Sequence, residues 1–169
     1  MNEIKMKTNF LRNKRGTAIV EMAIVLPLLL IILFGIVEFG VMLYDRQVIT
    51  NASREAARAG IVQAVSRPTS TFVIGVVNDY CDPPPAGTQR RLFNLGGPLN
   101  LTTRTYWDNG NVAGYTWVEI TGGNPICQNF PDNLRVEVTF PYDFLIFSRL
   151  ISAFGSTINL TANTIMKCE

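Results

Sequence analysis

Histidine is absent from this sequence of 169 residues, and its absence removes several kinds of chemistry. Without histidine there is no Ser-His-Asp or Cys-His arrangement for nucleophilic catalysis. The three cysteines form no Cys-x-x-Cys pair, so no metal site of the zinc type is predicted. A glycine loop that cradles phosphates, of the P-loop or dinucleotide-binding kind, is also missing. We therefore predict that the chain is not an enzyme and needs neither a metal nor a cofactor.

An excess of charge of one sign is also lacking, because the formal net charge is only +2. Beyond Asp45 acidic and basic residues are mixed, so the sequence predicts no nucleic-acid surface. The exception is the start of the chain, where Glu3 is the single acid. The basic residues there are Lys5, Lys7, Arg12, Lys14 and Arg15. By the positive-inside rule, this asymmetry predicts an N-terminus in the cytoplasm.

No charged residue lies between Met22 and Val37, and the run is bounded by Glu21 and Glu38. Residues 17–44 would form a helix of roughly 42 Å at 1.5 Å per residue, which exceeds the ~30 Å hydrocarbon core of a bilayer. We predict one membrane-spanning helix with the C-terminal part of the chain on the extracytoplasmic side. A cleaved secretory signal is the competing interpretation. Its apolar core would be shorter, however, and no Ala-x-Ala site follows promptly here.

The helical pattern continues past the membrane as an amphipathic stretch, with Val41, Tyr44 and Val48 at three- and four-residue steps. Because the residue before a proline is disfavoured in a helix, Pro68 predicts an end near Val65.

Three small residues, Ala52, Ala56 and Gly60, fall on one face of this helix and allow a close backbone approach. Two partners remain open for this face, the sheet of the same chain or the helix of a neighbouring subunit.

After Thr69 the pattern changes to that of a small antiparallel sheet. Alternation and turn signals predict strands at residues 99–106, 115–120, 134–140 and 156–167, with a hairpin turn at 108–111. Pro141 is expected to end the third of these strands. Residues 72–77 are either a strand or a last helical turn, and residues 146–154 are a short helix or a loop. The predicted class is α+β, one long helix packed on three to five strands.

The three cysteines, Cys81, Cys127 and Cys168, all lie beyond the membrane segment, where the compartment is oxidising. Cys81 and Cys127 both lie in loop-like sequence beside prolines, so we predict that these two form a disulfide. The bridge would contribute about 4 kcal/mol in the chain-entropy model. Three single-bridge pairings are possible, and the sequence leaves all of them open.

A more specific pattern surrounds Glu21, a carboxylate at the entrance to the apolar run. Gly16 follows Lys14-Arg15 and precedes Glu21 by five residues. This arrangement resembles the processing site of type IV pilin-like proteins. Further fragments that resemble one family among them are Arg15-Gly16, Val20-Glu21, Leu26-Pro27-Leu28-Leu29, Phe34-Gly35, Glu38-Phe39-Gly40, Asn51-Ala52 and Arg54-Glu55-Ala56-Ala57-Arg58-Ala59-Gly60. Together they resemble the TadE-like family, pilin-like proteins of the bacterial tight-adherence (Flp) pilus system.

The resemblance implies that a prepilin peptidase cuts after Gly16, so that Thr17 becomes the first mature residue. It also implies that Glu21 pairs with the new amine of a neighbouring subunit during assembly. A buried carboxylate is tolerable when it is paired with a buried ammonium. Met22 stands where the major Flp pilins usually carry Tyr, which favours an accessory member.

The resulting domain plan has four parts. These are a basic prepilin-type leader at 1–16, a membrane and filament-core helix at 17–44, an amphipathic extension at 45–66 and an extracytoplasmic β-rich domain at 67–169. We expect a pseudopilin or minor pilin in the bacterial cytoplasmic membrane that joins other pilin-like subunits in a surface filament. The alternative is an uncleaved, membrane-anchored binding module. Its candidate surface is the group of aromatic residues around the hairpin, Tyr106, Trp107, Tyr115 and Trp117.

Overall fold

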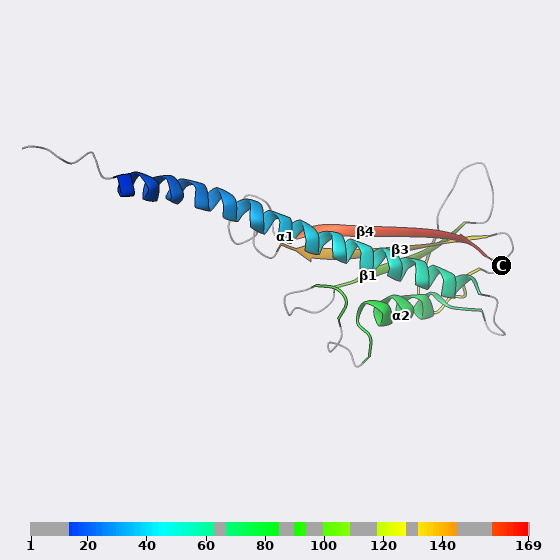
Figure 1. Cartoon of the computed structure of the whole chain (residues 1–169). Coiled ribbons are helices and arrows are strands. Elements are labelled where there is room, and N and C mark those ends of the chain that lie inside the picture. Colours follow the sequence, from blue (N-terminus) through cyan, green and yellow to red (C-terminus); the bar gives the residue numbers. More distant parts are fainter. Residues whose placement is uncertain are drawn as a thin grey trace, which may run out of the picture. The chain divides into compact units, whose positions relative to one another are not determined.

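A computed structural model describes residues 14–62, 67–84, 90–93, 100–108, 118–127, 132–144 and 157–168 of the chain. Contacts divide the chain into two compact units, Met1–Val37 and Glu38–Glu169. The second, which we call the folded unit, contains the C-terminal part of helix α1 and every other helix and strand that is described (Figure 1).

Helix α1 spans Lys14–Ile61 and continues through Pro27 without a break. Its end at Ile61 comes earlier than the predicted end near Val65. Proline removes one backbone donor, but the other backbone groups of a long helix remain bonded within the segment, as an apolar environment requires. The predicted membrane helix, 17–44, overlaps the folded unit at residues 38–44.

The described part of the chain contains an antiparallel sheet of four strands in the order β2-β1-β3-β4. The strands are β1 (Thr102–Asp108), β2 (Val118–Ile120), β3 (Asn133–Asp143) and β4 (Thr157–Lys167). The α+β prediction, with one long helix and a small antiparallel sheet, is confirmed. The predicted hairpin is also present, because β1 pairs with β2. Most of its turn and residues 146–154 lie outside the described residues.

Strand β3 contradicts one prediction, because it continues through Pro141 to Asp143. Proline cannot donate a ladder hydrogen bond and is tolerated where a strand has an open side. The pairing of β1 with β3 starts at Thr102 opposite Thr139, and on that side no described strand faces Pro141. On its other side β3 remains paired, with Pro141 opposite Asn159.

Residues 72–77, which the sequence left open between strand and helix, lie in helix α2 (Ser70–Cys81). Thr69 caps this helix by accepting a hydrogen bond from the Phe72 N–H at 3.3 Å. The buried residues of α2 recur at helical spacing and are Ser70, Val73, Val77 and Cys81. This period of three to four, rather than two, is what distinguishes a helix face from a strand.

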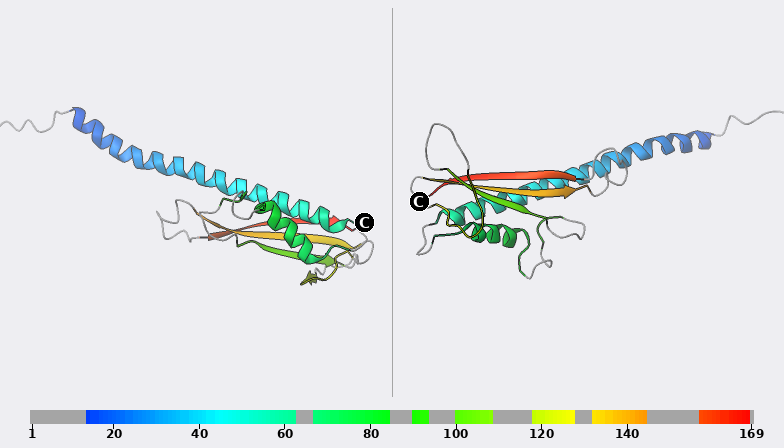
Figure 2. Two further views of the ribbon diagram at one scale, coloured as in Figure 1. Left: turned by 90° about the horizontal axis from the view of Figure 1, so that it is seen from below. Right: turned by 180° about the vertical axis from the view of Figure 1, so that it is seen from behind.

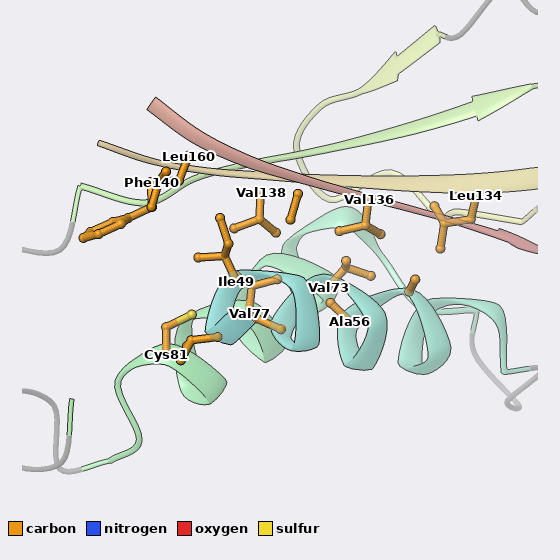
Figure 3. Close-up of a cluster of buried hydrophobic side chains, with 14 of the residues drawn as sticks. Ile49, Ala56, Val73, Val77, Cys81, Leu134, Val136, Val138, Phe140 and Leu160 are labelled. Carbon is orange, nitrogen blue, oxygen red and sulfur yellow. The ribbon is translucent and has the colours of Figure 1, made fainter. Parts of the chain in front are cut away.

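The core lies between the sheet and the two helices, which cover the same sheet face (Figure 2). Strand β3 contributes every second residue to it, and α1 and α2 contribute one stripe each (Figure 3). The buried side chains of β3 are Leu134, Val136, Val138, Phe140 and Tyr142. The face that α1 turns toward them is formed by Val48, Ile49, Ala52, Ala56 and Ala57.

The small-residue face of α1 therefore packs on its own chain. Ala52 and Ala56 are fully buried. A methyl group at Gly60 would lie 2.6 Å from Leu134 Cδ2, 2.9 Å from Ile126 Cδ1 and 3.1 Å from Val73 Cγ2. Of the two partners that the sequence left open, the structure shows the chain's own sheet and α2.

Candidate processing and assembly site

The predicted cleavage site lies in the first turn of α1. The helix begins at Lys14, and both Gly16 and Thr17 are exposed. The first four N–H groups of any helix lack partners within the helix, and glycine lowers helix stability by roughly 1 kcal/mol relative to alanine. Nothing lies within 4 Å of the position that a Cβ at Gly16 would occupy. The Gly16–Thr17 bond is therefore accessible and lies where unwinding breaks few hydrogen bonds.

Glu21 follows Thr17 by four residues in the same helix, so the two lie on one face, about 6 Å apart along the axis. Glu21 is exposed, as are all its neighbours from 16 to 33. The structure thus places the candidate cleavage site and the candidate assembly carboxylate on one exposed helical surface.

The helix that carries Glu21 is long and apolar enough to cross a membrane. Its most apolar window has a mean hydropathy of 2.8, and none of that window is buried within the chain. A core helix of a water-soluble protein would instead bury most of such a surface. The exposed apolar surface therefore needs lipid or other protein chains around it.

A second carboxylate, Glu38, has a role that the sequence did not reveal. It is buried at the start of the folded unit, where Tyr142 Oη donates a hydrogen bond of 2.8 Å to Glu38 Oε1. Burial, followed by this hydrogen bond to the carboxylate, raises the pKa of Tyr142 above its usual range. The ring of Tyr142 packs edge-on against Phe144 with centroids 5.8 Å apart. The only sequence signal for this contact was the position of Glu38 at the end of the apolar run.

Asp45 is a second buried acid on α1, two turns after Glu38. Its Oδ1 accepts a 2.8 Å hydrogen bond from the Phe93 N–H, and its Oδ2 has no hydrogen-bond partner among the described residues. Burial raises the pKa of Asp45 to about 6, an effect that the bond from Phe93 partly opposes. The carboxylate thus ties the segment around Phe93 to α1.

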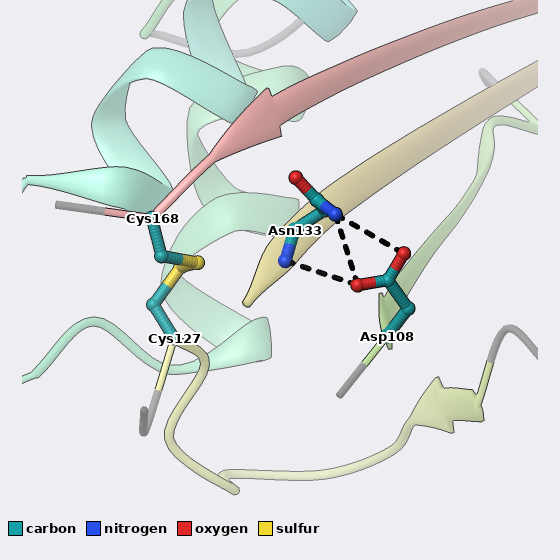
Figure 4. The surroundings of a disulfide bond; sticks show 4 residues. All are labelled: Asp108, Cys127, Asn133 and Cys168. Carbon is teal, nitrogen blue, oxygen red and sulfur yellow. Dashed lines mark hydrogen bonds between the residues drawn. A yellow bond between two sulfur atoms is a disulfide. The ribbon is translucent and has the colours of Figure 1, made fainter. Parts of the chain in front are cut away.

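The disulfide joins Cys127 to Cys168, with Cα atoms 5.5 Å apart (Figure 4). The predicted Cys81–Cys127 bridge is wrong. Cys81 is a free thiol in the core at the end of α2, and burial raises its pKa to about 12. Cys168 directly follows β4, and its N–H bonds the Asp132 carbonyl at 2.9 Å, which brings it to the start of β3. Sequence spacing does not encode this proximity.

A cavity of about 250 Å³ lies beside the disulfide. Its lining residues are Trp107, Glu119, Ile120, Asn124, Pro125, Ile126 and Cys127. Of the four aromatics considered as a binding surface, Trp107 lines this cavity, whereas Tyr106 lies against the Arg135 guanidinium at 5.3 Å. Tyr115 and Trp117 lie outside the described residues. Among the residues that are described, no group of three or more side chains is suited to hold a metal.

Comparison with known families identifies one match, which covers residues 16–58 and has the description TadE-like protein. This range begins at the candidate cleavage glycine and includes most of α1, so the TadE-like resemblance is confirmed. The match supports a protein associated with the tight-adherence (Flp) pilus. No curated protein and no solved structure matches the chain significantly.

Proposed function

We propose that this TadE-like chain is a structural and assembly subunit, a minor pilin or pseudopilin, of a Flp-type IV pilus. A prepilin peptidase removes residues 1–16, and α1 holds the mature subunit first in the membrane and then among neighbouring pilin-like helices. The observation that carries this proposal is the exposed apolar part of α1, residues 17–33, whose single carboxylate, Glu21, lies one turn after Thr17.

The role proposed for Glu21 follows from the cost of a charge in an apolar environment. A carboxylate at the centre of a membrane helix costs roughly 2.5–3.5 kcal/mol on insertion scales, and Glu21, near the end of the apolar run, costs less than this. Cleavage after Gly16 creates an ammonium group on Thr17 in every subunit. Pairing of Glu21 with the ammonium of a neighbour offsets this cost only when a second subunit is present. The pair thereby favours correctly staggered assembly over the isolated subunit.

The disulfide supports the proposed topology. Structural disulfides persist in oxidising compartments and are rare in the bacterial cytosol. The Cys127–Cys168 bridge therefore fits an extracytoplasmic folded unit, and the basic residues before Gly16 fit a cytoplasmic N-terminus. Both halves of the chain support the same orientation in the membrane.

The deciding experiment is N-terminal sequencing of protein from cells that contain the peptidase. The mature chain should begin at Thr17, and Gly16→Ala should retain the leader. Gly40→Ala is the matched control, because Gly40 is also helical and has nothing within 4 Å of the position that an added methyl group would occupy. A mature protein that begins at Met1 in peptidase-positive cells would refute processing.

A separate measurement tests the charge pair. Glu21→Ala should leave cleavage largely intact but reduce the amount of the subunit in sheared surface filaments. Glu55→Ala, an exposed acid farther along α1, is the control and should assemble normally. Normal incorporation of Glu21→Ala would remove the proposed pairing and leave the processing result untouched.

The cavity at Trp107 favours a second candidate, an uncleaved anchor whose folded unit binds an envelope partner. A cavity lined mainly by apolar side chains, with an aromatic residue and a few polar groups, is typical of binding sites in proteins. This candidate predicts protein that stays in the membrane fraction with residues 1–16 attached and never enters filaments. The same N-terminal sequencing and shearing experiments distinguish it from the pilus subunit.

A further inference from the structure

The outer face of α1 stays apolar beyond the point where the folded unit begins. Phe39, Leu43 and Tyr44 are 61%, 60% and 54% exposed, although all three belong to the folded unit. The opposite face of the same two turns is buried and carries Glu38 and Asp45. From Arg46 to the end of α1 the exposed residues are all polar. They are Arg46, Gln47, Arg54, Glu55 and Arg58. The exposed surface of α1 therefore changes character at residues 44–46.

Two further exposed apolar side chains lie at the same end of the folded unit. Ile158 on β4 is opposite Tyr142, whose hydroxyl bonds Glu38. Phe93 follows the buried Leu92, and its N–H bonds Asp45. Phe93 thus bonds α1 directly, and Ile158 is linked to α1 through its strand neighbour Tyr142. Both lie near the first turns of α1 in this unit.

We call the five residues Phe39, Leu43, Tyr44, Phe93 and Ile158 the apolar base. The other large apolar side chains that are exposed on the described part of the folded unit are Val62, Phe72 and Ile165. These three are scattered, since Val62 follows the end of α1, Phe72 lies on α2 and Ile165 lies near the end of β4. The apolar base is therefore a local concentration and not the general character of the surface.

We propose that the apolar base immerses in the interfacial layer of the membrane that α1 crosses, so that the folded unit is held against the bilayer before assembly. This inference rests on the insertion of α1 and not on cleavage or filament formation. Residues 17–37 have a helical length of about 31 Å, which matches a hydrocarbon core of about 30 Å.

The interfacial layer beyond that core has the right depth for the apolar base. The headgroup regions bring the bilayer from about 30 Å to about 40–45 Å, or roughly 5–8 Å on each side. Phe39 to Tyr44 lie about 3–10 Å beyond Val37 along the helix axis. Aromatic residues favour this layer, and Arg46 follows where lipid phosphates accept a cation. The polarity change at residues 44–46, about 10–14 Å beyond Val37, thus lies within several ångströms of the outer boundary of the bilayer.

The test compares two isoleucines on one strand. The full chain carries Ile158→Cys or Ile165→Cys, labelled with an environment-sensitive fluorophore, in vesicles of phosphatidylcholine and phosphatidylglycerol at high lipid excess. Both side chains are exposed, at 43% and 57%, and they lie about 23 Å apart along β4. Peptide mapping first establishes that the Cys127–Cys168 bridge is intact in both variants.

The probe at 158 should show blue-shifted emission and lose most of it to lipids brominated high on the acyl chain. The probe at 165 should behave as in water. Equal responses at both positions, or none at 158, would overturn the proposal. A blue shift at 158 that appears only when subunits are concentrated and is not quenched by the brominated lipids would also overturn it, because a second copy rather than lipid would then cover the apolar base.

A second variant pair separates lipid contact from a general loss of structure. Replacing Phe39 and Leu43 together with Gln should weaken the quenching at 158. Phe72→Gln, an equally exposed aromatic on α2, should leave it unchanged. Unchanged quenching in the double variant would show that these α1 side chains do not hold the folded unit at the bilayer.

Discussion

Replacing Gly60 with Ala should destabilise the folded unit although alanine is the better helix former. The added methyl group would lie 2.6 Å from Leu134, 2.9 Å from Ile126 and 3.1 Å from Val73. All three are buried, so none can move into solvent. They come from three different elements, β3, the segment after β2, and α2. One methyl group therefore has to displace three separate parts of the core.

The expected magnitude is a balance of two effects. Overpacking a well-filled core typically costs 1–3 kcal/mol. Exchange of glycine for alanine in a helix returns up to about 1 kcal/mol, and less in a last turn. We expect the free energy of unfolding to fall by about 1–2 kcal/mol. For a unit of this size the melting temperature should fall by several degrees.

The assay is urea unfolding of the full chain in detergent, followed by circular dichroism. Gly75→Ala in α2 is the matched control, because nothing lies within 4 Å of its added methyl group. It should be neutral or stabilising. If Gly60→Ala matches Gly75→Ala in stability but abolishes filament incorporation, overpacking is refuted, and the small-residue face serves a neighbouring subunit instead.

Three further predictions concern features that only the structure shows, namely the disulfide, the hydrogen bond of Tyr142 and the buried carboxyl group of Asp45. Cys168→Ser should lower the free energy of unfolding by about 4 kcal/mol under non-reducing conditions, as loop-closure entropy predicts for its bridge, whereas Cys81→Ser should leave that bridge intact in peptide maps. Tyr142→Phe removes a buried hydrogen bond to a carboxylate and should cost about 1.5–3 kcal/mol in urea unfolding. Burial raises the pKa of Asp45 from 3.8 to about 6, so its contribution to stability is fully present below pH 3.8 and is lost as the pH rises through 6. That loss amounts to about 3 kcal/mol, and Asp45→Asn should remove it from the pH profile of unfolding.

Each of these predictions has a clear contrary outcome. Under reducing conditions Cys168→Ser should become as stable as the reduced parent chain, and a persistent difference would point to packing instead of the bridge. Tyr44→Phe, at an exposed position, is the control for Tyr142→Phe and should be silent. A pH profile of Asp45→Asn that parallels the parent chain between pH 4 and 6 would assign the titration to another group.

The secondary structure was predictable where the local pattern was strong. The alternation in 134–140 identified β3, and the turn signal at 108–111 identified the β1–β2 hairpin. The prediction for Pro141 was wrong because whether a strand tolerates proline depends on the neighbouring strand. That neighbour, β1, begins at Thr102 opposite Thr139 and does not reach Pro141. Helix α2 stayed open because a run as short as 72–77 fits either period. Its cap at Thr69 and the burial of one of its faces in the core decided the outcome.

The sequence by itself determined the apolar helix, and it also predicts the orientation of that helix and the candidate site at Gly16, Thr17 and Glu21, because these depend on residues close together along one chain segment. Tertiary structure alone decided which cysteines meet, what the small-residue face of α1 contacts and why Glu38 is buried. Those outcomes depend on residues more than forty positions apart, such as Glu38 and Tyr142, which only folding brings within hydrogen-bond distance. Local periodicity carries no information about such distant partners, whereas the sheet register and the helix that packs on it fix them.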